Sequence, residues 1–315
     1  GFPSGDLQAK THLSGGSRSH KRQRPRQPRL RKKQAMKNVL LTIAYDGTNF
    51  CGWQRQPEQR SVQEEVEKAL SVICAQPIRI NGTSRTDAGV HAHGQRANFI
   101  AEFGIPVEKI PAAANAILAG AAGRKYRNAA GDAVILAAEE VPLDFHARYN
   151  AIGKKYLYKI CCSRKPDPFQ RNYVYQIGKA LDLDAMEQAT KFLIGTRDFR
   201  CFMAAGGKEP ETTVRTVYSA RFLRLDERTV GFEIIGDGFL YNMVRIIVGT
   251  LVDIGQGRKK PDDMPDIIES RDRKAAGHTA PAQGLYLSEV YFDKTKLSEG
   301  IPAGEEIFRK TRSGE

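Results

Sequence analysis

IRINGTSRTDAGVHAHGQRANFIAEF, residues 78–103, places two apolar segments on either side of a turn that is rich in glycine and charge. The flanks IRIN (78–81) and QRANFIAEF (95–103) have the composition of β-strands. The turn between them holds Arg85, Asp87 and two histidines. Functional side chains are commonly displayed on connections between rigid strands, so this stretch predicts a strand-based fold that carries chemistry on a loop.

The segments around this stretch predict a first unit of strands and helices. NVLLTIAY (38–45) and AVILAAE (133–139) have the apolar, β-branched composition of buried strands. S-V-Q-E, which begins at Ser61, forms a capping box ahead of a periodic helix. An Ala-rich helix is expected around residues 106–119.

A second unit is expected to begin near Phe145. Its predicted elements, in chain order, are a strand over 154–162, a helix over 184–195, strands over about 213–225 and 229–236, a helix over 239–255 and a strand over 286–292. Asp184 and Glu187 form a capping-box signature for the first of these helices.

These patterns predict the α+β class, with two mixed domains, largely antiparallel sheets and an active-site cleft between the domains. The N-terminal domain covers residues 38–144 and the C-terminal domain covers residues 145–292. Residues 1–37 are expected to form a basic disordered tail, and residues 293–315 a C-terminal extension.

Charge is distributed unevenly along the chain. Residues 1–37 hold 11 Lys or Arg and one acid, whereas the remainder holds 38 basic and 35 acidic residues. The tail could be an arm that attracts RNA, an organelle-targeting segment or a solvated extension, and these alternatives stay open. No membrane span is expected, because Arg245 interrupts the most apolar helix. Five cysteines without a C-x-x-C pair favour a reducing compartment, so we expect a cytoplasmic protein, or an organellar one if the tail is a targeting remnant.

Two motifs suggest other chemistry. His91 and His93 could share one face of a strand, but a catalytic zinc needs a third ligand that no comparable motif supplies, so no metal is predicted. YDGT (45–48) is similar to a phosphatase loop with an aspartyl nucleophile, but the nucleophile position is Ala44. A turn that ends the first strand is therefore predicted at Asp46.

Charged residues in unusual surroundings are the remaining candidates. Arg245 lies in an apolar helix, where burial is costly without an anionic partner. A paired guanidinium and one that reaches solvent at the helix edge both stay open. Asp87 could pair with its neighbour Arg85. Two nearby arginines would lower the pKa of Asp87 and keep it ionised, which suits a nucleophile or a base.

Eight segments, taken in order, resemble the TruA family of tRNA pseudouridine synthases over nearly all of residues 38–292. They are YDGTNFCGWQ (45–54), SVQEEVEKAL (61–70), SRTDAGVHAHGQ (84–95), FHARYNAIGKKYLYKI (145–160), DFRCFMAAG (198–206), VRTVY (214–218), GDGFLYNMVRIIVGTL (236–251) and APAQGLYL (280–287). One departure is Ser84, where many members carry glycine.

The resemblance implies a role for each matching residue. Asp87 would be the catalytic aspartate, Tyr156 would contact the target uracil, and Arg245 would pair with the aspartate. Arg85 would bind RNA phosphates or the flipped nucleotide. The implied reaction is isomerisation of uridine in or near the tRNA anticodon arm by a homodimer that needs no cofactor or metal. The alternative is an RNA-binding or RNP-assembly protein of the same fold that does not depend on catalysis.

Overall fold

The computed structural model of the chain describes residues 35–121, 130–207 and 209–301. Residues 1–34, the greater part of the predicted basic tail, lie outside these ranges, as do residues 302–315 of the predicted C-terminal extension. None of the helices in the described ranges is long and apolar enough to cross a membrane.

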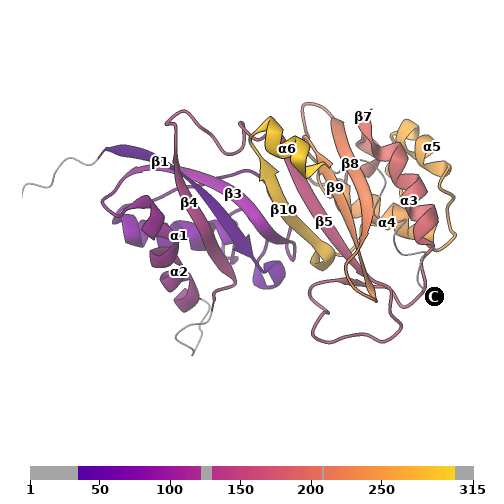
Figure 1. Cartoon of the computed structure of the whole chain (residues 1–315), viewed down its shortest axis with the longest axis horizontal. Coiled ribbons are helices and arrows are strands. Elements are labelled where there is room, and N and C mark those ends of the chain that lie inside the picture. The colour runs from indigo at the N-terminus through magenta and orange to yellow at the C-terminus, as the bar shows by residue number, and fades with distance from the viewer. Residues whose placement is uncertain (1–34, 122–129, 208, 302–315) are drawn as a thin grey trace, which may run out of the picture. The chain divides into compact units, whose positions relative to one another are not determined.

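In the described residues, ten strands form one sheet (Figure 1). They are β1 (Met36–Tyr45), β2 (Asn81–Gly82), β3 (His91–Glu102), β4 (Ala133–Val141), β5 (Gly153–Cys161), β6 (Tyr175–Gln176), β7 (Gly195–Asp198), β8 (Val214–Arg224), β9 (Thr229–Gly236) and β10 (Leu285–Tyr291). Eight of them follow the order β4-β1-β3-β10-β5-β9-β8-β7, while β2 pairs with β3 and β6 pairs with β5. Most neighbours are antiparallel, and β10 is parallel to β3. The predicted α+β class with largely antiparallel strands is confirmed.

The last strand of the sheet joins the two halves of the chain. β10 pairs with β3 from the first half and with β5 from the second. The sheet is therefore continuous from residues before 144 to residues after 145. The division into two domains, with a cleft between them, stays a prediction.

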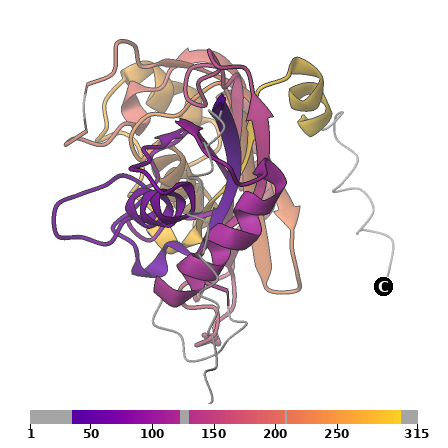
Figure 2. The ribbon, with the colours of Figure 1, turned by 90° about the vertical axis from the view of Figure 1, so that its left-hand side faces the viewer.

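The described helices lie beside the sheet. They are α1 (Val62–Cys74), α2 (Ile110–Ala121), α3 (Leu183–Thr190), α4 (Met243–Gly255), α5 (Asp263–Ser270) and α6 (Lys294–Gly300). Short 3₁₀ turns are η1 (Gly47–Asn49), η2 (Val107–Lys109), η3 (Lys191–Leu193), η4 (Arg200–Phe202) and η5 (Ala282–Gly284). Figure 2 shows α6 on the side of the sheet away from α1. Leu297 of α6 packs with Ile235 of β9 and Tyr291 of β10 in a small buried cluster that is separate from the main core.

Two predicted features of the first half have different outcomes. Ser61 caps α1 as predicted, because its hydroxyl accepts from the backbone N–H of Glu64. The strand predicted at 78–81 is reduced to Asn81–Gly82. Side chains of α1 supply the missing backbone partners, since Ser71 Oγ accepts from Ile78 N and Glu67 Oε1 accepts from Ile80 N. A neighbouring strand is therefore not needed before residue 81.

The capping box predicted at Asp184 is wrong. Asp182 is the N-cap of α3, and its carboxylate accepts from the N–H of Ala185. Glu187, the other half of the predicted box, instead accepts from the N–H of Phe222 on β8. The Glu187 carboxylate, which the local pattern assigned to the N-terminus of the helix, therefore binds the sheet instead.

Candidate active site

Two side chains and one backbone N–H hold the loop that carries Asp87. The amide of Gln95 accepts from Ser84 N and donates to Ser84 O, at 3.3 and 2.7 Å. Tyr45 and Thr86 share a hydrogen bond of 2.7 Å between their hydroxyls. The backbone N–H of Trp53 donates to Thr86 O at 3.0 Å. The residues on either side of Arg85 are thus fixed through both backbone and side chains, which orders the loop before any substrate binds.

Two glycines allow other segments to approach this loop closely. Gly52 has a φ of +106°, and a Cβ placed on it would lie 2.6 Å from Thr86 O. A Cβ on Gly47 would lie 2.0 Å from Val90 O. Since only glycine leaves room for such backbone contacts, the motif around residues 45–54 supports the Asp87 loop from outside.

Asp87 and Arg245 form an ion pair although 158 positions separate them in the chain. Arg245 Nη1 donates to Asp87 Oδ2 at 3.1 Å, and the two side chains are 17% and 25% exposed. The guanidinium is oriented further by Asn242 Oδ1 at 2.7 Å and by Ala280 O at 2.8 Å. Of the two open alternatives for Arg245, the paired guanidinium is the one that the structure contains.

Sequence reasoning missed Asn242. It adopts a left-handed backbone with a φ of +58° at the N-cap of α4 and makes no capping bond with its side chain. Its side chain accepts from Arg245 instead. Asparagine tolerates this conformation better than most residues, so an Asn three positions before the arginine of an apolar helix is the signal that was available.

The titration of Asp87 differs from the prediction. Burial raises the pKa of the Asp87 carboxyl, and the charge and hydrogen bond of Arg245 only partly oppose that rise. The prediction of a lowered pKa is wrong, because it counted two arginines and no desolvation. Asp87 Oδ1 accepts no hydrogen bond from a described residue, so one carboxylate oxygen is held while the other is open to a reacting group.

Tyr156 lies in β5 and belongs to the same site. Its side chain is buried, and its ring meets Phe239 edge to face at a centroid distance of 5.2 Å. Burial and the nearby charge of Asp87 raise the pKa of Tyr156 to about 12, so the phenol stays neutral at physiological pH. The structure therefore brings together three of the four predicted residues.

Arg85 is the fourth predicted residue, and it is placed differently. Its side chain is exposed, and it forms no ion pair with any residue in the described ranges, Asp87 included. The departure at Ser84 needs no glycine for its backbone, since Ser84 is not among the residues with a positive φ, and its side chain is buried. The Arg85–Asp87 pair that the sequence left open is absent from these ranges, while a role for Arg85 toward RNA stays a prediction.

A second feature that sequence reasoning missed is a group of cations at the start of the loop. Lys154 Nζ donates to Thr83 O at 3.2 Å. Burial lowers the pKa of Lys154 to about 8, Arg148 and Arg215 add to that lowering, and Asp237 opposes it. Such a concentration of positive charge attracts phosphate. At Lys154 the sequence indicated only a strand over 154–162.

The two histidines have structural partners. His91 Nδ1 accepts from Gly47 N at 3.0 Å, and its Nε2 lies 2.9 Å from Asn172 O. His93 stacks on Tyr286 at a centroid distance of 4.9 Å. In the described residues no group of three potential metal ligands is found. Asp46 caps the 3₁₀ turn η1, as the predicted turn requires.

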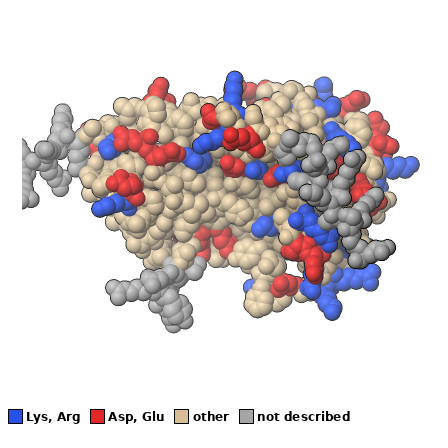
Figure 3. All heavy atoms as spheres, viewed as in Figure 1, with Lys and Arg blue, Asp and Glu red and all other residues tan. Residues whose placement is uncertain are grey.

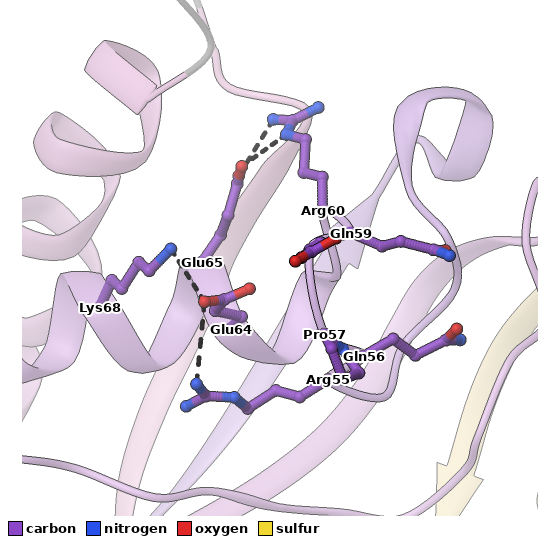
Figure 4. A pocket seen from close by; sticks show the side chains of 9 residues that line it. Arg55, Gln56, Pro57, Gln59, Arg60, Glu64, Glu65 and Lys68 are labelled. Carbon is purple, nitrogen blue, oxygen red and sulfur yellow. Dashed lines mark hydrogen bonds and ion pairs between the residues drawn. The ribbon is translucent and has the colours of Figure 1, made fainter.

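A hollow of about 640 Å³ lies between α1 and the loop before it (Figure 4). Its charged side chains neutralise one another, because Arg60 pairs with Glu65 while Arg55 and Lys68 both pair with Glu64. The four predicted site residues, all within the described ranges, do not line it. This hollow therefore has little net charge to offer a nucleic acid.

Comparison with known proteins places these features in a family. The sequence profile of a family described as tRNA pseudouridine synthase matches residues 41–150 and 189–293. Relatives named tRNA pseudouridine synthase A from Acetivibrio thermocellus and Clostridium acetobutylicum are each 46% identical over 257 residues, which cover 82% of this chain and 100% of theirs. A protein from Clostridium tetani, named tRNA pseudouridine synthase A 2, is 45% identical over 259 residues, or 82% of this chain and 99% of its own.

The class is that of enzymes that isomerise uridine in RNA. The chain belongs to the tRNA pseudouridine synthase family. A solved structure described as a Cbf5-Nop10-Gar1 complex matches 79% of this chain and 57% of its own at 11% identity and a TM-score of 0.31, which is too low to carry a structural argument.

Proposed function

We propose that this chain converts uridines in or near the tRNA anticodon arm to pseudouridine, with Asp87 as the catalytic carboxylate. The observation that carries the proposal is the ion pair between Asp87 and Arg245, with buried Tyr156 beside it. A desolvated carboxylate with one fixed oxygen is typical of a catalytic group rather than of a surface salt bridge.

The reaction itself needs little besides such a group. The N1–C1′ bond of the uridine breaks, and the uracil turns so that C5 forms the new bond to C1′. C5 then loses its proton, and N1 gains one. Uridine and pseudouridine are isomers, so the reaction needs no oxidant or reductant. Asp87 Oδ1 can add to the sugar, add to the base or remove a proton. All three routes use Asp87 Oδ1, while Oδ2 keeps its hydrogen bond from Arg245.

The target uridine must leave its stack to reach a carboxylate that is partly buried. Enzymes that act on bases in this way hold the extruded base against aromatic side chains. Tyr156 supplies a neutral ring, because its raised pKa keeps the phenol protonated. Arg85 is exposed and carries a permanent charge, which suits contact with the RNA backbone.

We further propose a homodimer, which the resemblance stated above implies. A cytoplasmic location is proposed because the relatives named above come from bacteria. An organelle is the alternative if the basic tail, residues 1–37, is a targeting remnant. Sedimentation of the full chain tests the oligomeric state: a dimer mass supports the proposal, and a monomer at working concentration contradicts it.

Substrate position is tested with tRNA transcripts in which uridines are replaced by cytidines one arm at a time. We expect pseudouridine to disappear when the anticodon-arm uridines are replaced and to persist when those of the other arms are replaced. Product that depends only on another arm would overturn the anticodon-arm proposal. Absence of product from every transcript would favour the RNA-binding alternative.

A further inference from the structure

The loop that joins β5 to β6 displays an aromatic ring to solvent. Phe169 is 82% exposed, and its N–H donates to Asp167 Oδ1 at 2.8 Å, which fixes a tight turn at this position. The carbonyl of Pro168 in the same turn accepts from Arg171. A single exposed phenylalanine is common on protein surfaces, so exposure alone decides nothing. What distinguishes this ring is that its backbone is held in place.

The far end of this loop is anchored by three hydrogen bonds. Tyr173 OH donates to Asp46 Oδ2 at 2.6 Å, and Tyr286 OH donates to Tyr173 O at 2.8 Å. His91 Nδ1 accepts from Gly47, so its Nε2 carries the proton and donates to Asn172 O. Burial raises the pKa of Asp46, but bonds from Thr48 and Tyr173 outweigh that effect and lower it overall. The anchor is therefore complete at neutral pH.

The anchor adjoins the Asp87 loop. Gly47, next to Asp46, is packed so closely on the backbone of Val90 that no Cβ would fit between them. Val90 N donates to Asp87 O at 3.2 Å. One continuous set of contacts thus links the turn that holds Phe169 to the loop that holds the reactive carboxylate.

The charge of this loop favours one kind of partner. Arg164, Lys165 and Arg171 are exposed and form no ion pair with other described residues, while Asp167 is the one acid of residues 163–174. Figure 3 shows basic side chains gathered at the lower right edge, where Figure 1 shows the loop after β5. Cations around an aromatic ring are the combination that binds phosphates and stacks bases at once.

We propose that residues 163–174 form an RNA-contacting arm, in which Phe169 stacks on an unpaired base outside the target uridine while Arg164, Lys165 and Arg171 bind the neighbouring phosphates. This inference rests on the proposed function, because it takes the RNA substrate as the partner. The arm would contact the RNA at a place separate from the site formed by Asp87, Tyr156 and Arg245.

The test measures affinity separately from turnover. Fluorescence anisotropy is used with an unmodified tRNA transcript and with a blunt RNA duplex that has no unpaired base. Phe169→Ala should weaken tRNA binding by about 5- to 100-fold, Phe169→Trp should restore it, and neither should change duplex binding. Arg164→Gln combined with Lys165→Gln should weaken both RNAs and reduce the salt dependence of binding.

Val72→Ala is the matched control, because Val72 is 67% exposed and lies on α1, at the other end of the sheet from this loop (Figure 1). It should bind both RNAs like the wild type. Equal tRNA affinity for Phe169→Ala and Val72→Ala would overturn the proposal of an RNA-contacting arm. A Phe169→Ala protein that binds tRNA normally but changes its oligomeric state in sedimentation would also overturn it, because the ring would then contact a second copy of the chain. Turnover at saturating RNA should persist in Phe169→Ala, so loss of the arm and loss of the proposed function are distinguishable.

Discussion

Arg245 controls how Asp87 ionises. Burial raises the pKa of Asp87 and Arg245 opposes that rise, so removal of the guanidinium should raise this pKa further. The ionised form of Asp87 predominates only above its pKa. For Arg245→Leu we therefore expect the acid limb of kcat/KM to move to higher pH, with kcat at neutral pH falling roughly 100-fold and RNA affinity changing much less.

The control for that variant is Arg258→Leu, which removes an arginine from an exposed pair with Asp253. Its pH profile should match that of the wild type, since exposed pairs contribute little. An Arg245→Leu protein with normal kcat and weakened binding would contradict the role given to the ion pair.

Lys154 should titrate in the range where activity is usually measured. Its pKa is lowered to about 8 by burial and by Arg148 and Arg215, with Asp237 opposing. The side chain is charged below that pH and neutral above it, so RNA affinity should fall as pH rises from 7 to 9. Lys154→Arg keeps its charge over this range and should remove the fall. Identical pH profiles of Kd for the two proteins would show that Lys154 does not face the RNA.

Among elements, the close packing of the Gly52 turn on the Asp87 loop makes the strongest prediction. Gly52→Ala combines a φ of +106° with a Cβ that would lie 2.6 Å from Thr86 O. We expect a loss of about 1–3 kcal/mol in the free energy of unfolding, measured in urea, and a larger loss of turnover.

Gly120→Ala is the comparison, because a Cβ on Gly120 of α2 meets nothing within 4 Å. Alanine should leave stability unchanged or raise it by up to about 1 kcal/mol. If both variants unfold at the same urea concentration, the close approach of Gly52 does not matter.

The sequence predicted interactions between residues close together in the chain better than interactions between distant ones. The capping of α1 by Ser61 depends on residues three positions apart and was predictable. Glu187 was misassigned because its partner, Phe222, comes from β8. The Asp87 pKa was misjudged for the same reason, since desolvation is a property of the whole surrounding structure. Asn242 and Lys154 act through contacts that no local pattern in the sequence displays.

For the molecule as a whole, every residue of the proposed site comes after residue 35 in the chain. The segments that match the family, residues 41–150 and 189–293, also come after it. Residues 38–315 carry only three more basic than acidic residues. A chain that begins at residue 35 should therefore keep its turnover at saturating tRNA. The slope of log affinity against log salt reports how many phosphates residues 1–34 contact. Loss of turnover at saturation in the shortened chain would contradict the assignment of the site to the described residues.

The central claim is that Asp87, brought to Arg245 and Tyr156 by a sheet that β10 holds together, isomerises uridine. The most direct measurement is pseudouridine mapping on anticodon-arm transcripts after incubation with the wild type and with Asp87→Ala at matched RNA occupancy. We predict new pseudouridine with the wild type and none with Asp87→Ala, although both bind the RNA. Equal product from the two proteins would contradict the role of Asp87.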